Sequence, residues 1–290
     1  MHEADAGRIE RALGLRPVSL ETAAGHGAPS NRRWIARFDD GSSAFAKIAA
    51  FDYTADWLRL EHEHYLALDG HRYLPRLFGW DDDGVEPTLV IEDLSQAMWP
   101  PPWSTEAVDA VLAALDEIQG TAPPATVGDL FGELFDIRQG WDPMRADPAP
   151  ALALGVFDRT WFERFADDLA AAAAAAELGG DTFLHGDVRS DNLCLREGRA
   201  VLVDWNWACV GARELDVAAW LPSLSYEGGP DPWVLLPDAG PLAALLAGFF
   251  LEHAGREPIP QAPHVRRLQL DQGRVSLAWA CRELGIAPPR

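Results

Sequence analysis

Residues 183–206 read FLHGDVRSDNLCLREGRAVLVDWN, and the organisation of the rest of the chain can be worked out from this stretch. A short apolar segment leads into a polar loop, and a second short apolar segment leaves it. Gly198 then turns the chain into a third apolar segment, which ends at Asp204. A hairpin of this kind brings two carboxylates and one carboxamide, those of Asp187, Asp204 and Asn192, to one edge.

These three side chains match the needs of phosphoryl transfer. The reaction requires a group that orients and deprotonates the attacking hydroxyl, and it requires oxygen ligands for Mg²⁺. Asp187 is the candidate for the first role, and Asn192 and Asp204 are the candidates for the second. The alternative is a surface loop in which Asp187 and Asn192 are ordinary turn residues. Spacing, strand context and the second aspartate together favour the catalytic interpretation.

The pattern H-G-D-x-x-x-x-N at residues 185–192, followed by Val203-Asp204, resembles the signature of aminoglycoside phosphotransferases and related choline kinase-like small-molecule kinases. It is also similar to the catalytic loop of protein kinases, with Gly186 in the place of arginine. The resemblance implies an α+β, two-lobed protein-kinase-like fold that binds ATP and Mg²⁺ between its lobes. It also implies that Asp216 braces the catalytic loop and takes no part in the chemistry.

Arg189 lies two residues after the candidate base. In the similar protein-kinase loop a lysine often occupies this place and meets the transferred phosphate. The resemblance therefore makes Arg189 a candidate catalytic residue that neutralises charge during transfer. The alternative is a solvent-facing arginine that pairs with Asp191, and the sequence leaves both interpretations open.

Lys47 stands inside the apolar run Ala44–Ile48, where an unpaired charge would be costly. Its small and apolar neighbours count against the alternative, a lysine on the solvent face of a strand. The resemblance assigns the α- and β-phosphates of the nucleotide to Lys47, and it predicts a helix glutamate that holds the lysine in place. Glu61 lies at the centre of the apolar face of the predicted helix 56–68, whereas Glu63 points away from it. We therefore expect a Lys47–Glu61 pair.

The glycine-rich segment 25–31 resembles the family's phosphate-covering loop, in which small residues let backbone N–H groups approach the nucleotide. It contains Pro29 and lacks the full G-x-G-x-x-G pattern, and a glycine pair also marks an ordinary turn. The residues that the resemblance assigns to nucleotide binding here are Gly25, Gly27, Ser30 and Asn31.

Residues 88–94 resemble the last strand of the small lobe, which runs into the hinge between the lobes. The resemblance implies that the Glu92 carbonyl and the Leu94 N–H bind the edge of the adenine. An ordinary buried strand with an acidic end fits the same residues.

The elements around these motifs change from strands to helices along the chain. Strands are predicted at residues 32–38, 43–48, 76–80 and 88–91. Helices are predicted from Ser104 to Gly120 and over 159–178, the second ended by Gly179-Gly180. The proline-rich segment 99–103 between the two regions reads as a linker, so we expect lobes of residues 1–94 and 95–290.

Composition limits the partners. The net charge is −21, from 45 acidic and 24 basic residues, so a nucleic acid or an anionic membrane would be repelled. A cationic small substrate would be attracted, although solubility explains the charge equally well. The longest apolar stretches, 169–176 and 241–251, are too short to span a bilayer, and the first residues do not form a signal peptide. We therefore expect a cytoplasmic protein.

Several other residues receive a structural interpretation. The three cysteines lack metal or disulfide spacing and are expected to be reduced, buried thiols: Cys194, Cys209 and Cys281. His62 and His64 lie two residues apart on the predicted helix, face different directions and are interpreted as surface histidines. Three of the tryptophans lie in proline-rich, loop-like contexts and are candidates for lining a substrate cleft: Trp99, Trp103 and Trp233.

The sequence as a whole predicts an ATP-dependent phosphotransferase that acts on a hydroxyl of a small molecule. By resemblance, the acceptor would be an aminoglycoside-like antibiotic, an amino sugar or a related metabolite. Residues 282–290 contain one acid, whereas aminoglycoside-modifying relatives often present several there. The first alternative is a pseudokinase-like regulator that binds nucleotide without turnover, and the intact set of Lys47, Asp187, Asn192 and Asp204 counts against it. The second is an interaction protein whose acidic surface binds a basic partner.

Overall fold

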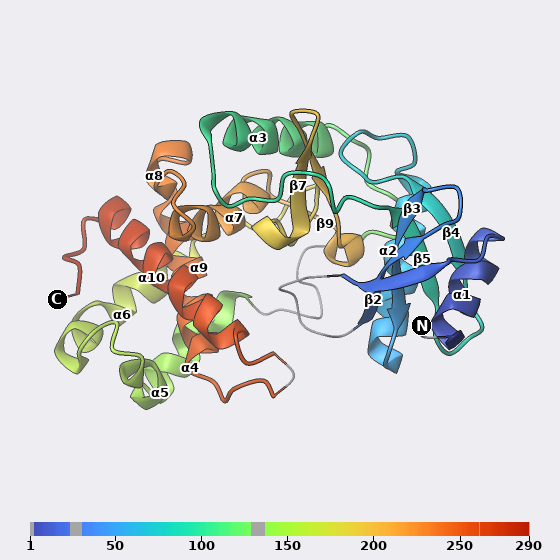
Figure 1. Cartoon of the computed structure of the whole chain (residues 1–290). Helices are drawn as coiled ribbons and strands as arrows, with labels where there is room; N and C mark the ends of the chain where they lie inside the picture. The colour runs from blue at the N-terminus through green and yellow to red at the C-terminus, as the bar shows by residue number, and fades with distance from the viewer. Residues whose placement is uncertain (1–2, 24–30, 129–136, 261, 290) are drawn as a thin grey trace.

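The computed structural model describes residues 3–23, 31–128, 137–260 and 262–289. An antiparallel sheet with two helices forms the N-terminal part, and a mainly helical part follows it, with the two chain ends at opposite ends of the molecule (Figure 1). The predicted α+β, two-lobed fold is confirmed. The sheet ends at Glu92 and the next helix begins at Thr105, while the lobe boundary at residue 94 stays a prediction.

The N-terminal lobe contains five strands in the order β1-β2-β3-β5-β4, and every neighbouring pair is antiparallel. Its elements are α1 (Glu3–Leu13), β1 (Ser19–Thr22), β2 (Asn31–Arg37), β3 (Ser43–Ala49), α2 (Asp52–Ala67), β4 (Leu77–Asp81) and β5 (Thr88–Glu92). The four predicted strands agree with β2 to β5 within about one residue at each end. The sequence analysis did not predict α1.

The alternation of side chains along β3 separates a packing face from a polar face. Ala44, Ala46 and Ile48 are buried on one face in a cluster with Ile9 of α1. Because successive side chains of a strand point to opposite faces, Lys47 lies on the other face, towards α2. The period of two in the sequence of β3 thus directs one lysine into the interior between the sheet and α2.

The second lobe consists of helices around two short two-stranded sheets. Its elements are α3 (Thr105–Gln119), η1 (Ile137–Gly140), α4 (Trp141–Ala146), α5 (Ala149–Ala153), α6 (Arg159–Ala174), β6 (Thr182–Leu184), η2 (Ser190–Asn192), β7 (Leu193–Arg196), β8 (Arg199–Leu202), η3 (Trp205–Trp207), β9 (Cys209–Gly211), α7 (Leu215–Tyr226), α8 (Pro232–Leu235), α9 (Gly240–Ala254) and α10 (Val265–Leu284). Strand β6 pairs with β9, and β7 pairs with β8. The hairpin predicted around Gly198 is therefore β7–β8.

Helix α6 is shorter than predicted. It ends at Ala174, although the alanine run continues to Ala176. The Leu178 carbonyl accepts a hydrogen bond from the Ala212 N–H (3.0 Å), and a Cβ on Gly180 would lie 2.4 Å from the Gly211 carbonyl oxygen. This close pairing with the chain after β9 takes residues 178–180 out of the helix, and it outweighs their local helix propensity.

Two further expectations concern the cysteines and the helices. All three cysteines are buried and free, as predicted. No helix in the described part of the chain combines the length and the apolar character needed to cross a membrane.

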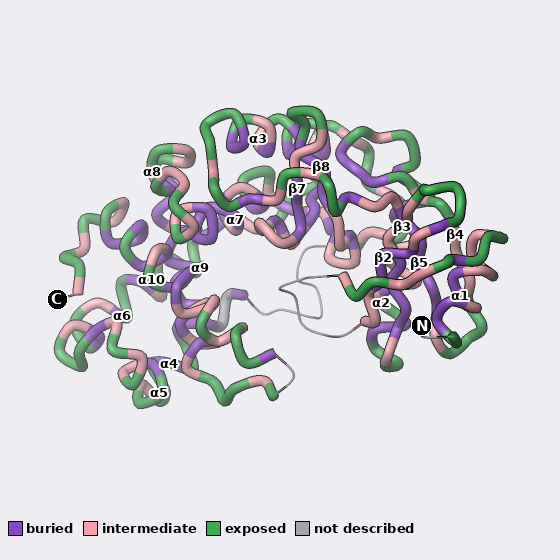
Figure 2. The backbone as a smooth tube through the Cα atoms, viewed as in Figure 1, coloured by how far each residue is buried: buried purple, intermediate pink, exposed green. Residues whose placement is uncertain are grey.

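The core of the second lobe depends on a close approach of η1 and α4 to α9, a largely buried helix (Figure 2). A Cβ on Gly248 of α9 would lie 2.5 Å from the Trp141 ring, and a Cβ on Gly140 would lie 2.2 Å from the Gly248 backbone. The Trp141 indole N–H donates to the Ala244 carbonyl at 2.7 Å. Glycine at residues 140 and 248 therefore leaves the space that the tryptophan fills.

We expect Gly248→Ala to destabilise the protein by about 1–3 kcal/mol, because the added methyl overlaps a buried indole in a close-packed core. Gly7→Ala is the matched control: a Cβ at Gly7 of α1 would meet no atom within 4 Å, so it should stabilise the helix by about 0.5–1 kcal/mol. Urea unfolding followed by circular dichroism measures both changes. Equal effects of the two substitutions would contradict the packing argument.

Candidate active site

Lys47 connects the sheet, α2 and the segment after β8. Its Nζ lies 2.9 and 3.0 Å from the two carboxylate oxygens of Glu61 and also forms an ion pair with Asp204. Lys47 is 3% exposed and Glu61 is 2% exposed, whereas Glu63 is exposed. The structure thus brings together three of the predicted residues, and it selects the same helix glutamate as the sequence pattern did.

The charges of this cluster depend on one another. Burial alone would lower the pKa of Lys47, but the carboxylates of Asp204 and Glu61 outweigh burial and raise it. Burial alone would raise the pKa of Asp204, but the charges of Lys47 and Arg33 lower it to about 2. Burial raises the pKa of Glu61 against the pull of Lys47. Lys47 and Asp204 therefore stay charged across the neutral pH range.

The loop between β6 and η2 is held by hydrogen bonds to the side chain of Asp216 in α7. The buried carboxylate of Asp216 accepts hydrogen bonds from the N–H groups of His185 (2.7 Å) and Gly186 (2.9 Å). The His185 ring lies 3.0 Å from the Val203 carbonyl through Nε2. Gly186 has a φ of 81°, and a Cβ there would lie 2.2 Å from the Trp207 carbonyl oxygen. Only glycine fits this position, which explains why the loop carries glycine between His185 and Asp187.

Asp187 leaves this loop next to Asn192 and Arg189. The Asn192 Nδ2 donates to the Asp187 carbonyl (2.9 Å) and to its Oδ2 (2.8 Å). Arg189 lies 3.2 Å from the Asp187 Oδ1 and donates to both carboxylate oxygens of Asp191 at 2.9 and 3.0 Å. Arg189 therefore pairs with Asp191, as one interpretation held, and also contacts Asp187. Burial raises the pKa of Asp187, although Arg189 opposes this effect and the side chain remains 26% exposed.

Asn192 and Asp204 fit the requirements of a nucleotide-bound Mg²⁺. The Asn192 carbonyl accepts a hydrogen bond from the Val203 N–H (2.9 Å), which ties it to the residue before Asp204. The side-chain nitrogen of Asn192 donates its hydrogen bonds to Asp187, so the side-chain oxygen of Asn192 is left for a ligand. No group of three or more potential metal-ligating side chains gathers anywhere in the described ranges. Two protein oxygens suit Mg²⁺, which usually completes its shell with substrate phosphates and water.

Of the other predicted nucleotide-binding residues, Gly25, Gly27 and Ser30 lie outside the described residues. Asn31 begins β2, and its buried Oδ1 has no hydrogen-bond partner among the described residues. The Glu92 carboxylate pairs with Arg196 at 2.5 Å. The Leu94 carbonyl accepts hydrogen bonds from the Ala97 N–H (3.0 Å) and the Trp99 indole (2.9 Å).

A model of the phosphotransferase enzyme family matches residues 23–259, which is most of the chain. The chain belongs to this family. The predicted resemblance is therefore confirmed, and the chain is a phosphotransferase of the same family as the aminoglycoside-modifying enzymes. Its acceptor stays a prediction. A search of curated protein sequences finds no match.

Solved structures of the phosphotransferase fold cover nearly the whole chain. An aminoglycoside phosphotransferase from Alicyclobacillus acidocaldarius has a TM-score of 0.60 at 14% identity, covering 95% of both chains. A choline/ethanolamine kinase family protein from Mesorhizobium loti has a TM-score of 0.60 at 16% identity, covering 98% of both. The amicoumacin kinase hAmiN, in complex with AMP-PNP, Ca²⁺ and Ami, has a TM-score of 0.53 at 13% identity, covering 95% of this chain and 97% of its own. These identities show the shared fold alone.

His64 of this phosphotransferase is not a surface histidine, so that interpretation was wrong. Its side chain is fully buried, and Nδ1 lies 2.8 Å from the Trp205 carbonyl, next to Asp204. The reason is helix geometry: His64 follows Glu61 by three residues and shares its buried face. His62 is partly buried and stacks on Trp80, with 4.1 Å between ring centroids. The position of His64 three residues after Glu61 was the signal that could have predicted its burial.

The sequence analysis also missed two other residues of this region. Arg33 of β2 acts electrostatically on Lys47, Glu61 and Asp204. Glu227, after α7, accepts hydrogen bonds from the Ser190 hydroxyl (2.5 Å) and the Trp103 indole (2.9 Å). Neither residue belongs to a contiguous motif, because each reaches the site from a distant part of the chain.

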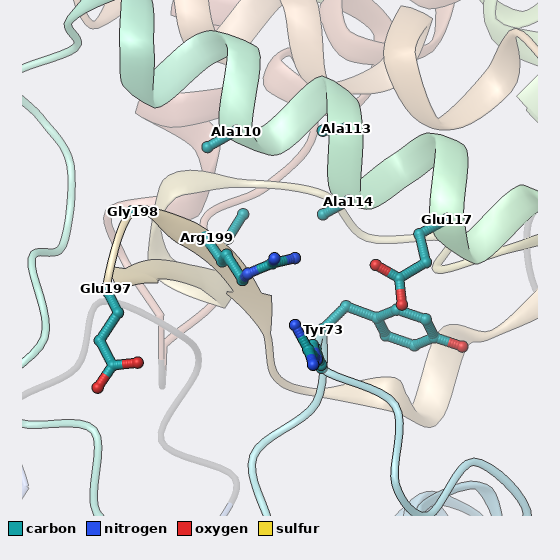
Figure 3. Close-up of a pocket in the computed structure, with 10 residues that line it drawn as sticks. Tyr73, Ala110, Ala113, Ala114, Glu117, Glu197, Gly198 and Arg199 are labelled. Carbon is teal, nitrogen blue, oxygen red and sulfur yellow. The ribbon is translucent and has the colours of Figure 1, made fainter.

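A cavity of about 420 Å³ lies between α3 and the turn of the β7–β8 hairpin (Figure 3). Alanines and Glu117 of α3 face Arg199 of the hairpin across it, and Glu197 at the hairpin turn is also part of the lining. Lys47, Asp187 and Asp204 do not line this cavity, so we do not assign the catalytic site to it.

Among these residues, His64 also predicts how stability depends on pH. Burial lowers the pKa of His64, so the folded state resists its protonation, whereas an unfolded histidine binds a proton below about pH 6.5. The contribution of neutral His64 to stability is therefore fully present above this pH and is lost as the pH falls. We expect His64→Gln, which keeps a donor for the Trp205 carbonyl, to weaken this decline by about 1 kcal/mol between pH 7 and pH 5.

Urea unfolding at several pH values, with the exposed His264→Gln as the control, measures this difference. A wild-type protein and a His64→Gln variant with the same pH dependence would contradict the prediction.

Proposed function

We propose that this phosphotransferase moves the γ-phosphoryl group of ATP to a hydroxyl of a small molecule in the presence of Mg²⁺. The observation that carries the proposal is the position of Lys47, which lies between Glu61 and Asp204 on buried ion pairs. A lysine on a sheet of the N-terminal lobe is thereby held against a candidate metal ligand of the second lobe. This is the arrangement that phosphoryl transfer needs, since the protein contributes mainly positioning and charge stabilisation.

Each of the site residues has a chemical role in this proposal. Lys47, oriented by Glu61, binds phosphate oxygens of the nucleotide, while Asn192 and Asp204 hold the metal ion. A Mg²⁺ ion held by Asn192 and Asp204 would supply positive charge to the phosphates during transfer. The oxygen of the acceptor hydroxyl forms the new bond to the γ-phosphorus, and the bond between that phosphorus and the leaving ADP breaks. Asp187 accepts the proton that the hydroxyl loses. Burial raises the pKa of Asp187, which makes it a better proton acceptor than an exposed aspartate.

The acceptor in this proposal carries a positively charged amine as well as the reacting hydroxyl. Glu227 supports this class because it is a partly buried carboxylate whose Ser190 partner lies in the same loop as Asp187. Glu227 accepts two hydrogen bonds from neutral groups, and no described lysine, arginine or histidine forms an ion pair with it. An ammonium group of the acceptor would supply the missing cation. Aminoglycoside-like antibiotics and amino sugars have this chemistry.

Asp187→Asn tests the proposed base. We expect the turnover number to fall by roughly 10²–10⁴, because the amide cannot accept the proton, while the affinity for Mg·ATP stays unchanged. ADP release in the presence of a panel of amine-bearing acceptors measures the turnover number, and calorimetric titration measures the affinity for Mg·ATP. The exposed Asp168→Asn on α6 is the charge-matched control. Nucleotide binding without turnover on any acceptor would favour a regulatory protein instead.

Glu227→Gln tests the acceptor class. We expect the KM for an amine-bearing acceptor to rise roughly tenfold, because one charged contact is lost, with little change in the turnover number. The KM for an analogue in which a hydroxyl replaces the amine should not rise. Steady-state kinetics with the two acceptors provides the comparison, and equal effects on both would exclude Glu227 as the ammonium-binding group.

A further inference from the structure

Arg33 lies directly beside Lys47 on the sheet. Strands β2 and β3 are antiparallel, and their register places Arg33 opposite Lys47. Directly opposed residues of neighbouring strands project to the same face of a sheet. Both cations therefore face α2 and the catalytic segment, which is the part of the chain after β8 that carries Asp204. The neighbouring Arg32 projects to the other face, where it contacts Asp5 (3.2 Å) and Glu86 (2.8 Å).

The carboxylates near Lys47 pair with Lys47 itself, and the Arg33 side chain has no ion-pair partner among the described residues. Lys47 is already paired with both Glu61 and Asp204. Through space, the charge of Arg33 opposes the effect of burial on the pKa of both carboxylates, but its guanidinium forms no ion pair or hydrogen bond with any described residue. Its Nε is shielded from solvent. Since a buried donor without a partner is destabilising, the Nε of this guanidinium is an unsatisfied donor among the described residues.

Two other unsatisfied polar atoms surround the same cluster. The Asn31 Oδ1 is buried without a described partner, and Asn31 shares a strand face with Arg33 because it lies two residues before it. The Tyr65 hydroxyl is also buried without a described partner, one helical turn after Glu61. A polar ligand that enters here would find donors and acceptors that no described residue uses.

We propose that Arg33 is a second phosphate-binding cation of the nucleotide site and acts beside Lys47. This inference rests on the proposed function, because it concerns the same ATP-binding site. A polyphosphate brings several negative charges to a place where the carboxylates of Glu61 and Asp204 already occupy Lys47. The planar guanidinium of Arg33 donates to phosphate oxygens in a fork geometry, and a phosphate supplies the partner that Arg33 lacks in the described part of the chain.

The competing explanation gives Arg33 a structural role, in which its charge balances Glu61 and Asp204 and holds the cluster together. The two roles differ in what the substitution changes. A phosphate-binding arginine affects ligands that carry phosphates and spares the nucleoside. A structural arginine affects ATP and adenosine together, because the whole site is disturbed.

Calorimetric titration of the wild type, Arg33→Gln and Arg32→Gln with ATP, ADP and adenosine separates these roles. We expect Arg33→Gln to weaken ATP and ADP binding roughly 10- to 100-fold, as the loss of a charge-assisted hydrogen bond implies, with adenosine affinity unchanged. Arg32→Gln removes the same charge from the opposite face of the same strand and should leave all three affinities unchanged. Arg33→Lys should recover part of the ATP affinity and serves as the test variant if Arg33→Gln does not fold.

Three results would overturn the inference. Unchanged ATP affinity in Arg33→Gln would exclude a phosphate contact, and equal losses for ATP and adenosine would establish the structural role. In both cases the proposed function would stand, provided that the wild type binds ATP. A wild-type protein that binds neither ATP nor ADP would overturn the proposed function and this inference with it.

Discussion

The buried charge of Lys47 is the constraint on which the rest of the site depends. Lys47 is 3% exposed, so its ammonium group must have carboxylate partners, and they come from two different parts of the fold. Glu61 reaches it from α2, and Asp204 reaches it from the segment after β8. The position of α2 against the sheet and the position of the catalytic segment below it are therefore fixed by the same cation. His64 adds a neutral contact between α2 and that segment through the Trp205 carbonyl.

The catalytic segment is in turn fixed by backbone geometry. Asp204 has a φ of 66°, in the left-handed region that few residues other than glycine adopt, and aspartate tolerates it better than most. Gly186 brings its loop against the Trp207 carbonyl, where no larger residue fits. Asp216 then binds the two N–H groups of this loop. The ion pairs of Lys47 and these buried backbone hydrogen bonds thus hold the functional side chains in place together.

Sequence reasoning predicted the parts of this arrangement that follow from short-range patterns. The family resemblance called for a helix glutamate beside Lys47, and the position of Glu61 on its helix then selected it over Glu63, because helical periodicity is a local pattern. The strand and hairpin around Gly198 followed from turn chemistry in the same way. Arg33 and Glu227 could not be predicted in this way. Strand register places Arg33 beside Lys47, and tertiary contacts bring Glu227 to the catalytic loop. The predicted end of α6 was wrong for a related reason, because packing against the chain after β9 outweighed the helix propensity of the alanine run and the residues after it.

The two sides of the catalytic loop differ in charge, and the difference matches the two proposed substrates. On the sheet side, Lys47 and Arg33 face the carboxylates of Glu61 and Asp204, so this side approaches neutrality and gains from a polyphosphate and its metal ion. Around Ser190, the loop carries Asp191 and lies against Glu227. Arg189 offsets part of that negative charge, but it is shared between Asp187 and Asp191 and leaves Glu227 without an ion-pair partner among the described residues. An anionic nucleotide would be attracted by the first arrangement of charges and the proposed cationic acceptor by the second, so both proposed substrates would approach Asp187, where the acceptor hydroxyl has to lie next to the γ-phosphoryl group that it attacks.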